Sequence, residues 1–310
     1  MGDSRYIIRN YRASDFNSFV QLKSEAQSLT AEGGWLSPQA VSENLERPNY
    51  SPEQGLFVVE ADENIVGYMD MAPEIAIGRV ILDCWVDPEH RRRGLATRLL
   101  KSATHRAQGL GAKLAHVNIA EDNVVARGVL SKLGFECVRK FLELRLDMTK
   151  VRWSCVDKAT LGCRHLQCGE EDKLTQIQNR SFSGTWGYNP NTEEEVRYAI
   201  SMSNCAREGI LLAYERDRPI GYCWTRMESE EKSATDESKG RIFMLGVDPD
   251  YRGRGVGRRV VLAGLAYLRS KGLRFAELTV DSENKPACAL YRSVGFEICS
   301  TSSWYEKVLS

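Results

Sequence analysis

The chain has 310 residues, a length typical of two domains, and 42% of them are hydrophobic, so each half can bury its own core. Lysine plus arginine and aspartate plus glutamate each number 42, so the net charge is close to zero and does not favour nucleic acid as a partner, and no apolar run is long enough to predict a membrane span. The nine cysteines are scattered without a CxxC pair or a histidine cluster, and the N-terminal residues have no apolar signal core, so we expect a cytoplasmic protein with reduced thiols and no metal site.

The first half of the chain alternates between short apolar runs, which predict strands, and apolar residues at helical spacing, which predict helices. The predicted strands are residues 6–9, 56–60, 65–69, 80–86, 114–119 and 136–148. The predicted helices are residues 95–108 and 124–133, with shorter ones that begin near residues 15 and 38. We expect a first domain over residues 1–149, and a connection over residues 150–160, where no period is strong.

The second half, residues 161–310, repeats this order and is predicted to form a second domain. The predicted strands are residues 210–214, 220–224, 242–247 and 275–280, and the predicted helices are residues 171–180, 256–270 and 285–294, with another that begins after Thr192. Residues 181–190 read as a loop, and the polar residues 228–239 as an extended, solvated hairpin. The resulting pattern is α+β, with a helical crossover between two parallel strands.

A turn rich in glycine and arginine, residues 248–257, joins a predicted strand to a predicted helix in the second half. Glycine lets a ligand approach the backbone, and the free N–H groups at a helix start bind anions. The spacing fits neither a Walker loop nor a dinucleotide fingerprint, and an ordinary tight turn is the alternative. We expect the backbone amides of this turn to hold a pyrophosphate, with added positive charge from Arg252, Arg254 and Arg258.

The chain contains this pattern twice. Residues 86–96 match residues 247–257 without a gap, and equivalent positions (94 and 255, for example) differ by 161. The same difference relates Asn123 to Asn284 and a later Gly-Phe pair in each half. We therefore interpret the chain as two tandem copies of one domain.

These residues carry a family resemblance. Val-Asp-Pro, then Arg-x-x-Gly-x-Gly or Ala, a helix, a strand, an asparagine and, in the second copy, Tyr-x-x-x-Gly-Phe resemble the GNAT acyltransferase superfamily, which uses acetyl-CoA. The likeness covers residues 56–140 and 210–300. Two such domains in one chain also resemble mycothiol synthase, a likeness of architecture. The resemblance implies an α+β fold of two tandem GNAT-type domains, each a mixed, mostly antiparallel sheet with splayed central parallel strands flanked by helices.

The resemblance also implies which residues bind acetyl-CoA. Val247 would offer main-chain groups to the pantetheine arm and an N–H to the thioester oxygen, and Asn284 matches a residue that binds the coenzyme, although a helix cap explains this asparagine equally well. The residues expected to bind the cofactor in the second copy are Leu245, Val247, Arg252, Gly253, Arg254, Gly255, Val256, Gly257, Arg258 and Asn284. Those of the first copy are Val86, Arg91, Arg92, Arg93, Gly94, Leu95 and Ala96.

Tyr291 matches the family's general acid for the departing thiolate. A phenol with a pKa near 10 can protonate a thiolate whose conjugate acid has a pKa near 8.5, with modest tuning. The alternative is a core aromatic residue. The first copy has Leu130 at this position, so we expect it to be catalytically silent, although its loop retains the features that bind CoA.

The sequence does not decide which residue acts as the general base. Many family members place an acid on the strand before the turn, where the first copy has Asp83 and the second has Met244. Glu277 is the base candidate of the second copy, and Asp281 and Glu283 are alternatives that strand alternation does not separate from it.

The loop 181–190 is expected to wall the acceptor pocket, with Trp186 and Tyr188 stacking on an apolar or sugar-like body. A packed loop is the alternative for both. Two functions stay open: an N-acetyltransferase that moves an acetyl group from acetyl-CoA to the primary amine of a small molecule or peptide by direct attack in the second copy, and a non-catalytic regulator or scaffold that binds acyl-CoA. The sequence predicts no oligomeric state.

Overall fold

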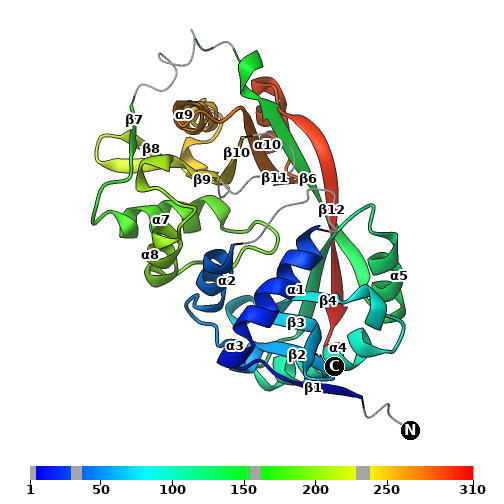
Figure 1. The fold of residues 1–310 in the computed structure, drawn as a ribbon. Helices are drawn as coiled ribbons and strands as arrows, with labels where there is room; N and C mark the ends of the chain where they lie inside the picture. The colour runs from blue at the N-terminus through cyan, green and yellow to red at the C-terminus, as the bar shows by residue number, and fades with distance from the viewer. Residues whose placement is uncertain (1–4, 29–36, 152, 154–161, 228–237, 310) are drawn as a thin grey trace. The chain divides into compact units, whose positions relative to one another are not determined.

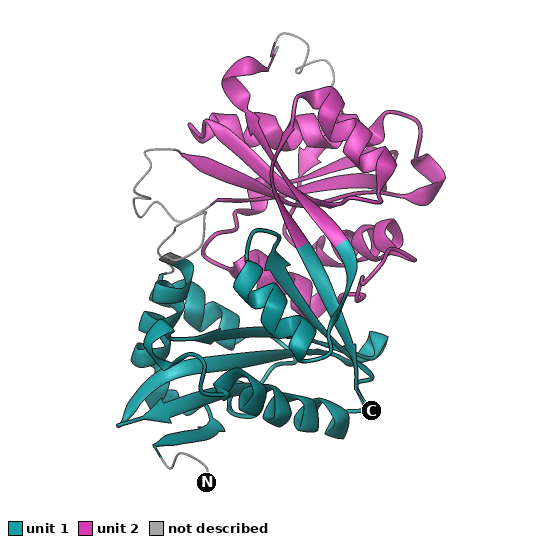
Figure 2. Ribbon diagram, turned by 90° about the vertical axis from the view of Figure 1, so that its right-hand side faces the viewer, with its two compact units in different colours: residues 1–139, 303–310 teal, residues 140–302 magenta. Residues whose placement is uncertain are grey.

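The structure, a computed structural model, describes residues 5–28, 37–151, 153, 162–227 and 238–309 (Figure 1). Most of the predicted connection 150–160 and of the predicted hairpin 228–239 lies outside the described residues. The chain forms two compact units (Figure 2): unit 1 comprises residues 1–139 and 303–310, and unit 2 comprises residues 140–302. Each unit is an α+β sheet flanked by helices, which confirms the predicted fold class.

Unit 1 is built on a sheet with the strand order β1-β2-β3-β4-β5-β12. Its strands are β1 (Tyr6–Asn10), β2 (Leu56–Ala61), β3 (Asn64–Glu74), β4 (Arg79–Val86), β5 (Leu114–Ala120) and the last part of β12 (Glu297–Val308). Its helices are α1 (Phe16–Ser28), α2 (Pro38–Leu45), α3 (Pro52–Gly55), α4 (Leu95–Gly109) and α5 (Val124–Lys132). Short 3-10 turns occupy Ala13–Asp15, Ile75–Ile77 and Pro88–His90.

Unit 2 has the strand order β6-β11-β10-β9-β8-β7. Its strands are β6 (Glu136–Asp147, shared with unit 1), β7 (Cys163–His165), β8 (Ile210–Glu215), β9 (Arg218–Met227), β10 (Lys239–Val247) and β11 (Phe275–Asp281). Its helices are α7 (Glu171–Phe182), α8 (Glu193–Ser201), α9 (Val256–Ser270) and α10 (Lys285–Val294), with 3-10 turns at Met148–Lys150, Arg207–Gly209 and Pro249–Tyr251. The three-residue edge strand β7 was not predicted.

Side-chain alternation along the strands divides each unit's core between two faces of its sheet. In unit 2, Tyr222 and Trp224 pack with the residues of α7 and α8, whereas the intervening Cys223 packs with those of α9 and α10. In β10, Met244 lies with the α7 cluster and Leu245 with the α9 cluster. This alternation decides whether a side chain of β10 faces α7 and α8 or faces α9 and α10.

The two central parallel strands of each unit separate after three paired residues. In unit 2, β10 and β11 pair only from Lys239 with Phe275 to Arg241 with Glu277, and in unit 1 β4 and β5 also pair over three positions. The predicted splay is therefore present in both units. Beyond it the units differ, because β10 has a register shift between Ile242 and Met244 against β9, whereas β4 pairs regularly with β3 along its whole length.

The closing strands differ from the predicted domain boundaries. We expected residues 136–148 to close the first copy, but residues 141–147 of β6 pair antiparallel with β11 of unit 2. The last residues of β12 in turn belong to unit 1, where Tyr305 is buried in the core and the Glu306 carboxylate lies 2.9 Å from Nε2 of His116. Both sheets offer the same kind of edge to a closing strand, so a sequence repeat cannot tell which sheet each strand joins.

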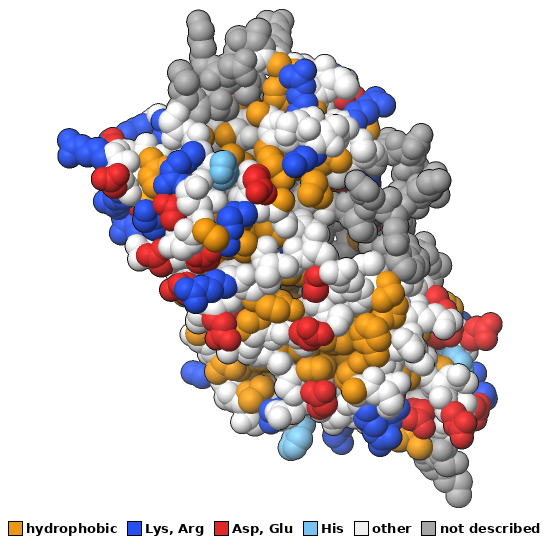
Figure 3. All heavy atoms as spheres, turned by 60° about the vertical axis from the view of Figure 1, so that its left-hand side comes forward, with side chains coloured by type: hydrophobic (Ala, Val, Ile, Leu, Met, Phe, Trp, Pro, Cys, Tyr) orange, Lys and Arg blue, Asp and Glu red, His pale blue; other side chains and the backbone are white. Residues whose placement is uncertain are grey.

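Among the described residues, no helix is both long enough and apolar enough to cross a membrane. On the face drawn in Figure 3, acidic and basic side chains are interspersed rather than gathered by sign, in keeping with the equal counts of the two charges.

Candidate active site

The glycine-rich turn of unit 2 has an open backbone. Gly253 and Gly255 have φ values of +74° and +80°, in the left-handed region that favours glycine, and a Cβ added to either would meet nothing within 4 Å. Helix α9 begins at Val256, so the N–H groups of its first turn have no partner within the helix. These exposed donors at the positive end of a helix dipole fit the diphosphate of a coenzyme.

A buried carboxylate fastens this turn to its own unit. Asp248 is fully buried, and its oxygens lie 2.9 Å from Nε of Arg180 and 2.7 Å from a terminal nitrogen of Arg218. The hydrogen bond from Arg180 is the main reason that the pKa of Asp248 is lowered to about 2. The carboxylate also accepts from the N–H of Asp250, which caps the 3-10 turn. The conformation of the turn is thus stabilised by three groups that bond to this carboxylate: Arg180, Arg218 and the N–H of Asp250.

Two of the three arginines predicted to add charge to the turn bind protein atoms. Arg252 donates to the carbonyl of Ser181 at 2.8 Å and to that of Val247 at 3.4 Å, and Arg258 donates to the hydroxyl of Ser293 at 3.0 Å. The guanidinium of Arg254 lies 5.2 Å from the centre of the Tyr251 ring. The side chains of Arg252 and Arg258 therefore brace the turn, and the amide N–H groups are its freest anion donors.

Helix α10, which carries Tyr291, packs beside the first turn of α9. A Cβ on Gly257, at the start of α9, would lie 3.1 Å from the Leu290 side chain, one residue before Tyr291. Tyr291 is buried, burial raises the pKa of its phenol above the ordinary value, and among the described residues its hydroxyl has no hydrogen-bond partner. The side chain of Asn284 caps α10 by accepting from the N–H of Ala287 at 3.2 Å. The cap accounts for Asn284 without a ligand; the free hydroxyl of Tyr291 remains available for chemistry.

Glu277, the base candidate, lies in an ion-pair cluster. Its carboxylate is 2.7 Å from Nε of Arg145 on β6 and 3.9 Å from Nζ of Lys239 on β10. It stands opposite Arg241, at the last position where β10 and β11 still pair. The carboxylate is buried and already compensated by two cations, so the contacts favour a structural role.

The loop 181–190 is held together by its own aromatic and amide groups. Tyr188 donates to Oδ1 of Asn179 at 2.7 Å, accepts from the side-chain amide of Asn191 at 3.1 Å and stacks on Phe182 at 5.1 Å between ring centres. Trp186 is half-buried, with its ring 6.1 Å from that of Phe141. The contacts of Tyr188 thus favour a packing role in this loop, and Trp186 is partly exposed.

Sequence reasoning missed three polar side chains on the α7 face of β10. Gln178 and Ser181, on α7, and Tyr222, on β9, are each buried, and each has a polar atom with no hydrogen-bond partner among the described residues. The sequence analysis placed Gln178 in a predicted helix, Tyr222 in a predicted strand and Ser181 in the predicted loop 181–190, and it gave none of them a functional role. Only the folded arrangement shows that they lie together.

The turn of unit 1 has nearly the same backbone. Gly94 has φ +73° and ψ +10°, against +80° and 0° for Gly255, and Arg92 takes a positive φ of +62° at the position of Gly253. Arg91 donates to the carbonyl of Val86 at 2.8 Å, as Arg252 does to Val247. Leu130 is buried where unit 2 has Tyr291. Unit 1 therefore keeps the backbone conformation of the turn and lacks the phenol.

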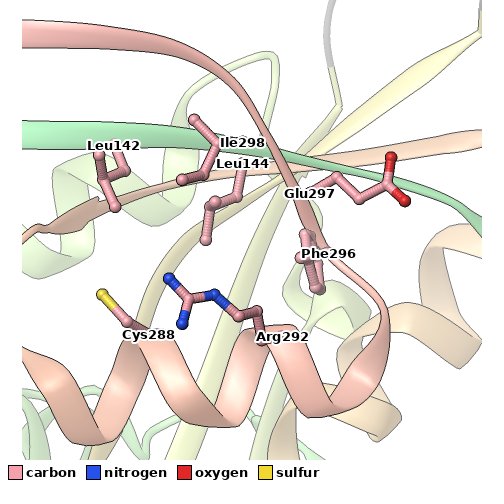
Figure 4. Close-up of a pocket in the computed structure, with 7 residues that line it drawn as sticks. All are labelled: Leu142, Leu144, Cys288, Arg292, Phe296, Glu297 and Ile298. Atoms are coloured by element: carbon pink, nitrogen blue, oxygen red, sulfur yellow. The ribbon is translucent and has the colours of Figure 1, made fainter.

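A cavity of about 290 Å³ lies beside α10 in unit 2 (Figure 4). Leu142, Leu144, Cys288, Arg292, Phe296, Glu297 and Ile298 line it. None of the predicted site residues is among them, although Phe296, one of the lining residues, packs edge-on against Tyr291 with 5.8 Å between the ring centres.

Comparison with known proteins decides the family. The model of the Acetyltransferase (GNAT) family matches residues 22–135 and 172–296, one match in each half of the chain. The chain belongs to the GNAT acetyltransferase family. This GNAT acetyltransferase is therefore an enzyme whose acyl donor is acetyl-CoA, as the resemblance implied.

Relatives and solved structures agree with this assignment. The chain is 31% identical to a mycothiol acetyltransferase of Amycolatopsis mediterranei over 86% of this chain and 91% of the relative, and 30% identical to one of Actinosynnema mirum over 81% and 82%. A GCN5-related N-acetyltransferase from Sphaerobacter thermophilus shares the fold with a TM-score of 0.74 at 22% identity, covering 100% of this chain and 97% of its own. A tandem GNAT protein from the clavulanic acid pathway gives a TM-score of 0.72 at 15% identity, over 98% and 99%. The tandem architecture predicted from the repeat is confirmed.

Proposed function

We propose that unit 2 carries out the acetyl transfer, with Tyr291 as the general acid, and that unit 1 holds coenzyme A without catalysis. The observation that carries the proposal is the contrast between equivalent positions on two equivalent helices. Tyr291 is a buried residue whose hydroxyl has no hydrogen-bond partner among the described residues, on a helix that packs beside the start of α9, whereas unit 1 has the inert Leu130 at this position.

The turn residues 252–258, through their backbone amides, bind the diphosphate, which places the thioester in the splay between β10 and β11. Leu245 and Val247 lie beyond Arg241, the last residue of β10 that pairs with β11, so their main-chain groups on that side are available to the pantetheine arm and the thioester oxygen. Bound acetyl-CoA supplies an acetyl group activated as a thioester. Orientation of this group against the acceptor amine is the main contribution of the backbone.

A neutral primary amine attacks the carbonyl carbon, a C–N bond forms as the C–S bond breaks, and the thiolate takes a proton from Tyr291. Because burial raises the pKa of Tyr291, the phenol keeps its proton until the thiolate forms, and the same surroundings also raise the proton affinity of that thiolate. The nitrogen loses its extra proton to solvent, and Tyr291 regains one. Among the carboxylates, Glu277 remains the base candidate to be tested, although its ion pairs favour a structural role.

In unit 1 the retained backbone conformation supports coenzyme binding by residues 91–96. Arg92 holds a left-handed conformation that costs a non-glycine residue about 1 kcal/mol, which is compatible with a loop shape needed for binding. Trp186 is proposed to contact the acceptor, because the residue is partly exposed, and Tyr188 to hold the loop that presents it.

The acceptor is proposed to be a small molecule. The relatives that cover most of the chain are mycothiol acetyltransferases, so the amine obtained by removing the acetyl group of mycothiol is the first acceptor to test. We also propose that the enzyme works in the cytoplasm, since the eight described cysteines are free thiols.

The test measures coenzyme A release from acetyl-CoA across an amine panel that includes this compound, glucosamine and a peptide amine. We expect turnover with at least one amine and a loss of about 100-fold in kcat for Tyr291→Phe, with acetyl-CoA affinity by calorimetry unchanged. Turnover that survives Tyr291→Phe would overturn the acid assignment. Binding of acetyl-CoA without release by any amine would support the alternative, a non-catalytic acyl-CoA regulator.

A further inference from the structure

Three polar groups of unit 2 are buried together without partners. Tyr222, Gln178 and Ser181 have exposed fractions of 0%, 2% and 5%, and among the described residues the Tyr222 hydroxyl, Oε1 of Gln178 and Oγ of Ser181 make no hydrogen bond. The side-chain nitrogen of Gln178 donates only to Sδ of Met244, a weak acceptor. Buried polar groups normally find partners, so a cluster of three orphans points to a partner from outside the chain.

These groups lie against one face of the part of β10 beyond Arg241, where β10 no longer pairs with β11. A Cβ on Gly246 would lie 2.6 Å from the Ser181 Cβ and 2.6 Å from the Tyr222 ring, so only glycine lets both approach the strand this closely. Gly246 and Met244 occupy the same face of β10, opposite the face of Leu245 and Val247. The cluster therefore lies on the α7 side of the strand whose other side meets α9 and the coenzyme-binding turn.

In unit 1, the side chains at the equivalent positions form hydrogen bonds and an ion pair with one another. Tyr68, the equivalent of Tyr222 on the neighbouring strand, donates to Oδ2 of Asp83 at 3.0 Å, and Nζ of Lys23 on α1 lies 2.5 Å from the same oxygen. Asp83 stands at the position of Met244 in the repeat. In unit 2 the central acid is thus replaced by methionine, and the tyrosine remains without its acceptor.

Lys23 and Gln178 are also equivalent. They stand at matching places in helices whose first turns begin with the same device, an arginine on the preceding strand paired with an acid: Arg9 with Asp15 in unit 1 and Arg164 with Glu170 in unit 2. In unit 1, a lysine, an aspartate and a tyrosine therefore bond to one another. In unit 2, the equivalent lysine and aspartate positions hold neutral side chains, and the tyrosine has no bonded partner among the described residues.

We infer that Gln178, Ser181 and Tyr222 determine acceptor specificity, and that they bind neutral hydroxyl or amide groups adjacent to the acceptor's amine. This inference rests on the proposed function of unit 2. The class of acceptor follows from the chemistry of the cluster: Oε1 of Gln178 needs a donor, the two hydroxyls can donate or accept, and no charged side chain takes part. An amino sugar carries suitable groups, and an alkylamine does not.

The first arm of the test compares the stability of Tyr222→Phe with that of Tyr68→Phe in the full chain. Loss of an unpartnered hydroxyl should leave the Tm of unit 2 unchanged or higher, whereas loss of the hydroxyl bonded to Asp83 should lower the Tm of unit 1 by about 3 °C. If Tyr222→Phe lowers the Tm as much as Tyr68→Phe, its hydroxyl has an internal partner such as a buried water, and the inference is overturned.

The second arm measures coenzyme A release with two probes of similar ring size, glucosamine and cyclohexylamine. We expect kcat/KM to favour glucosamine, and Tyr222→Phe, Ser181→Ala and Gln178→Leu each to reduce this preference about tenfold or more while the KM for acetyl-CoA stays constant. Equal use of the two amines by the unchanged enzyme, or a preference that survives all three substitutions, would overturn the inference alone. Release with no amine of the panel would overturn the proposed function as well.

Discussion

Asp248 in the turn of unit 2 and Arg180 at the end of α7 form a two-bond ion pair, with Oδ2–Nε at 2.9 Å and Oδ1 to a terminal nitrogen at 3.0 Å. Within the part of the chain that the structure describes, the equivalent Asp87 in unit 1 only caps its own turn, by accepting from the N–H of Glu89 at 2.8 Å. Two copies of one loop are thus stabilised differently: in unit 2 the loop is tied to the helix that carries Gln178 and Ser181.

This difference predicts unequal costs for the same substitution. Asp248→Asn should destabilise unit 2 by about 2 kcal/mol, because it removes a buried, paired charge whose arginines can return to solvent. Asp87→Asn, the matched control, should cost less than about 1 kcal/mol. Urea unfolding of the full chain, followed for each unit, measures both. Equal costs would contradict the role assigned to the ion pair.

The same carboxylate predicts a loss of stability in acid. Its pKa is lowered to about 2 in the folded chain, mainly by the hydrogen bond from Arg180, while the unfolded value is near 4. The stabilisation is complete above pH 4 and is lost as the pH falls through 4 towards 2. The free energy of unfolding of unit 2 should therefore decline over this window, and less steeply in Asp248→Asn. A slope that Asp248→Asn leaves unchanged would assign the decline to other groups.

The exchanged closing strand predicts that unit 1 depends on the end of the chain. Tyr305 is buried in its core, and the N–H of Leu309 donates to the carbonyl of Lys113 at 2.8 Å. Deleting residues 303–310 should unfold unit 1, although its other residues end at 139, and Tyr305→Ala should destabilise it by about 3 kcal/mol. Circular dichroism and proteolysis measure both effects. Lys113→Ala retains the carbonyl that Leu309 contacts and serves as the control. A stable, folded fragment 1–149 would contradict this prediction.

Glu277→Gln tests the base candidate against its ion pairs. Removing the charge leaves Arg145 and Lys239 without their buried partner, so we expect a destabilisation of about 2 kcal/mol. We expect kcat to change less than about fivefold and the acidic limb of its pH profile to stay in place. A loss of 100-fold or more in kcat with a shifted profile would instead identify Glu277 as the base.

The left-handed residue of each turn gives a reciprocal pair of predictions. Arg92→Gly should stabilise unit 1 by up to about 1 kcal/mol, since glycine adopts a positive φ without the Cβ penalty. Gly253→Ala should destabilise unit 2 by about 1 kcal/mol for the same reason. Differential scanning calorimetry compares the two. A destabilisation of unit 1 by Arg92→Gly, or a stabilisation of unit 2 by Gly253→Ala, would show that the two turns do not share a backbone conformation.

Much of the fold was predictable because it depends on short-range patterns. The helices after each glycine-rich turn begin where the sequence predicts, at Leu95 and Val256, because glycine and apolar spacing act locally. The predicted loop 181–190 is shorter in the structure, because α7 extends to Phe182, and the packing of Tyr188 inside it was one of two interpretations, since an aromatic residue in a loop can face either way. The three orphaned polar groups of α7 and β9 were missed, because buried polar residues have no period of their own.

The sequence by itself determined the duplication, the strand–turn–helix unit proposed to bind the coenzyme, and the family, because each depends on residue types at fixed spacing. Only the tertiary structure decided which sheet each closing strand joins and which partners surround Tyr222, Gln178 and Ser181. These depend on contacts between residues far apart in the chain, and equivalent sheet edges and equivalent core positions look alike in a one-dimensional pattern. Only the folded structure shows that the polar side chains of unit 1 bond to one another while the equivalent side chains of unit 2 have unbonded polar atoms among the described residues.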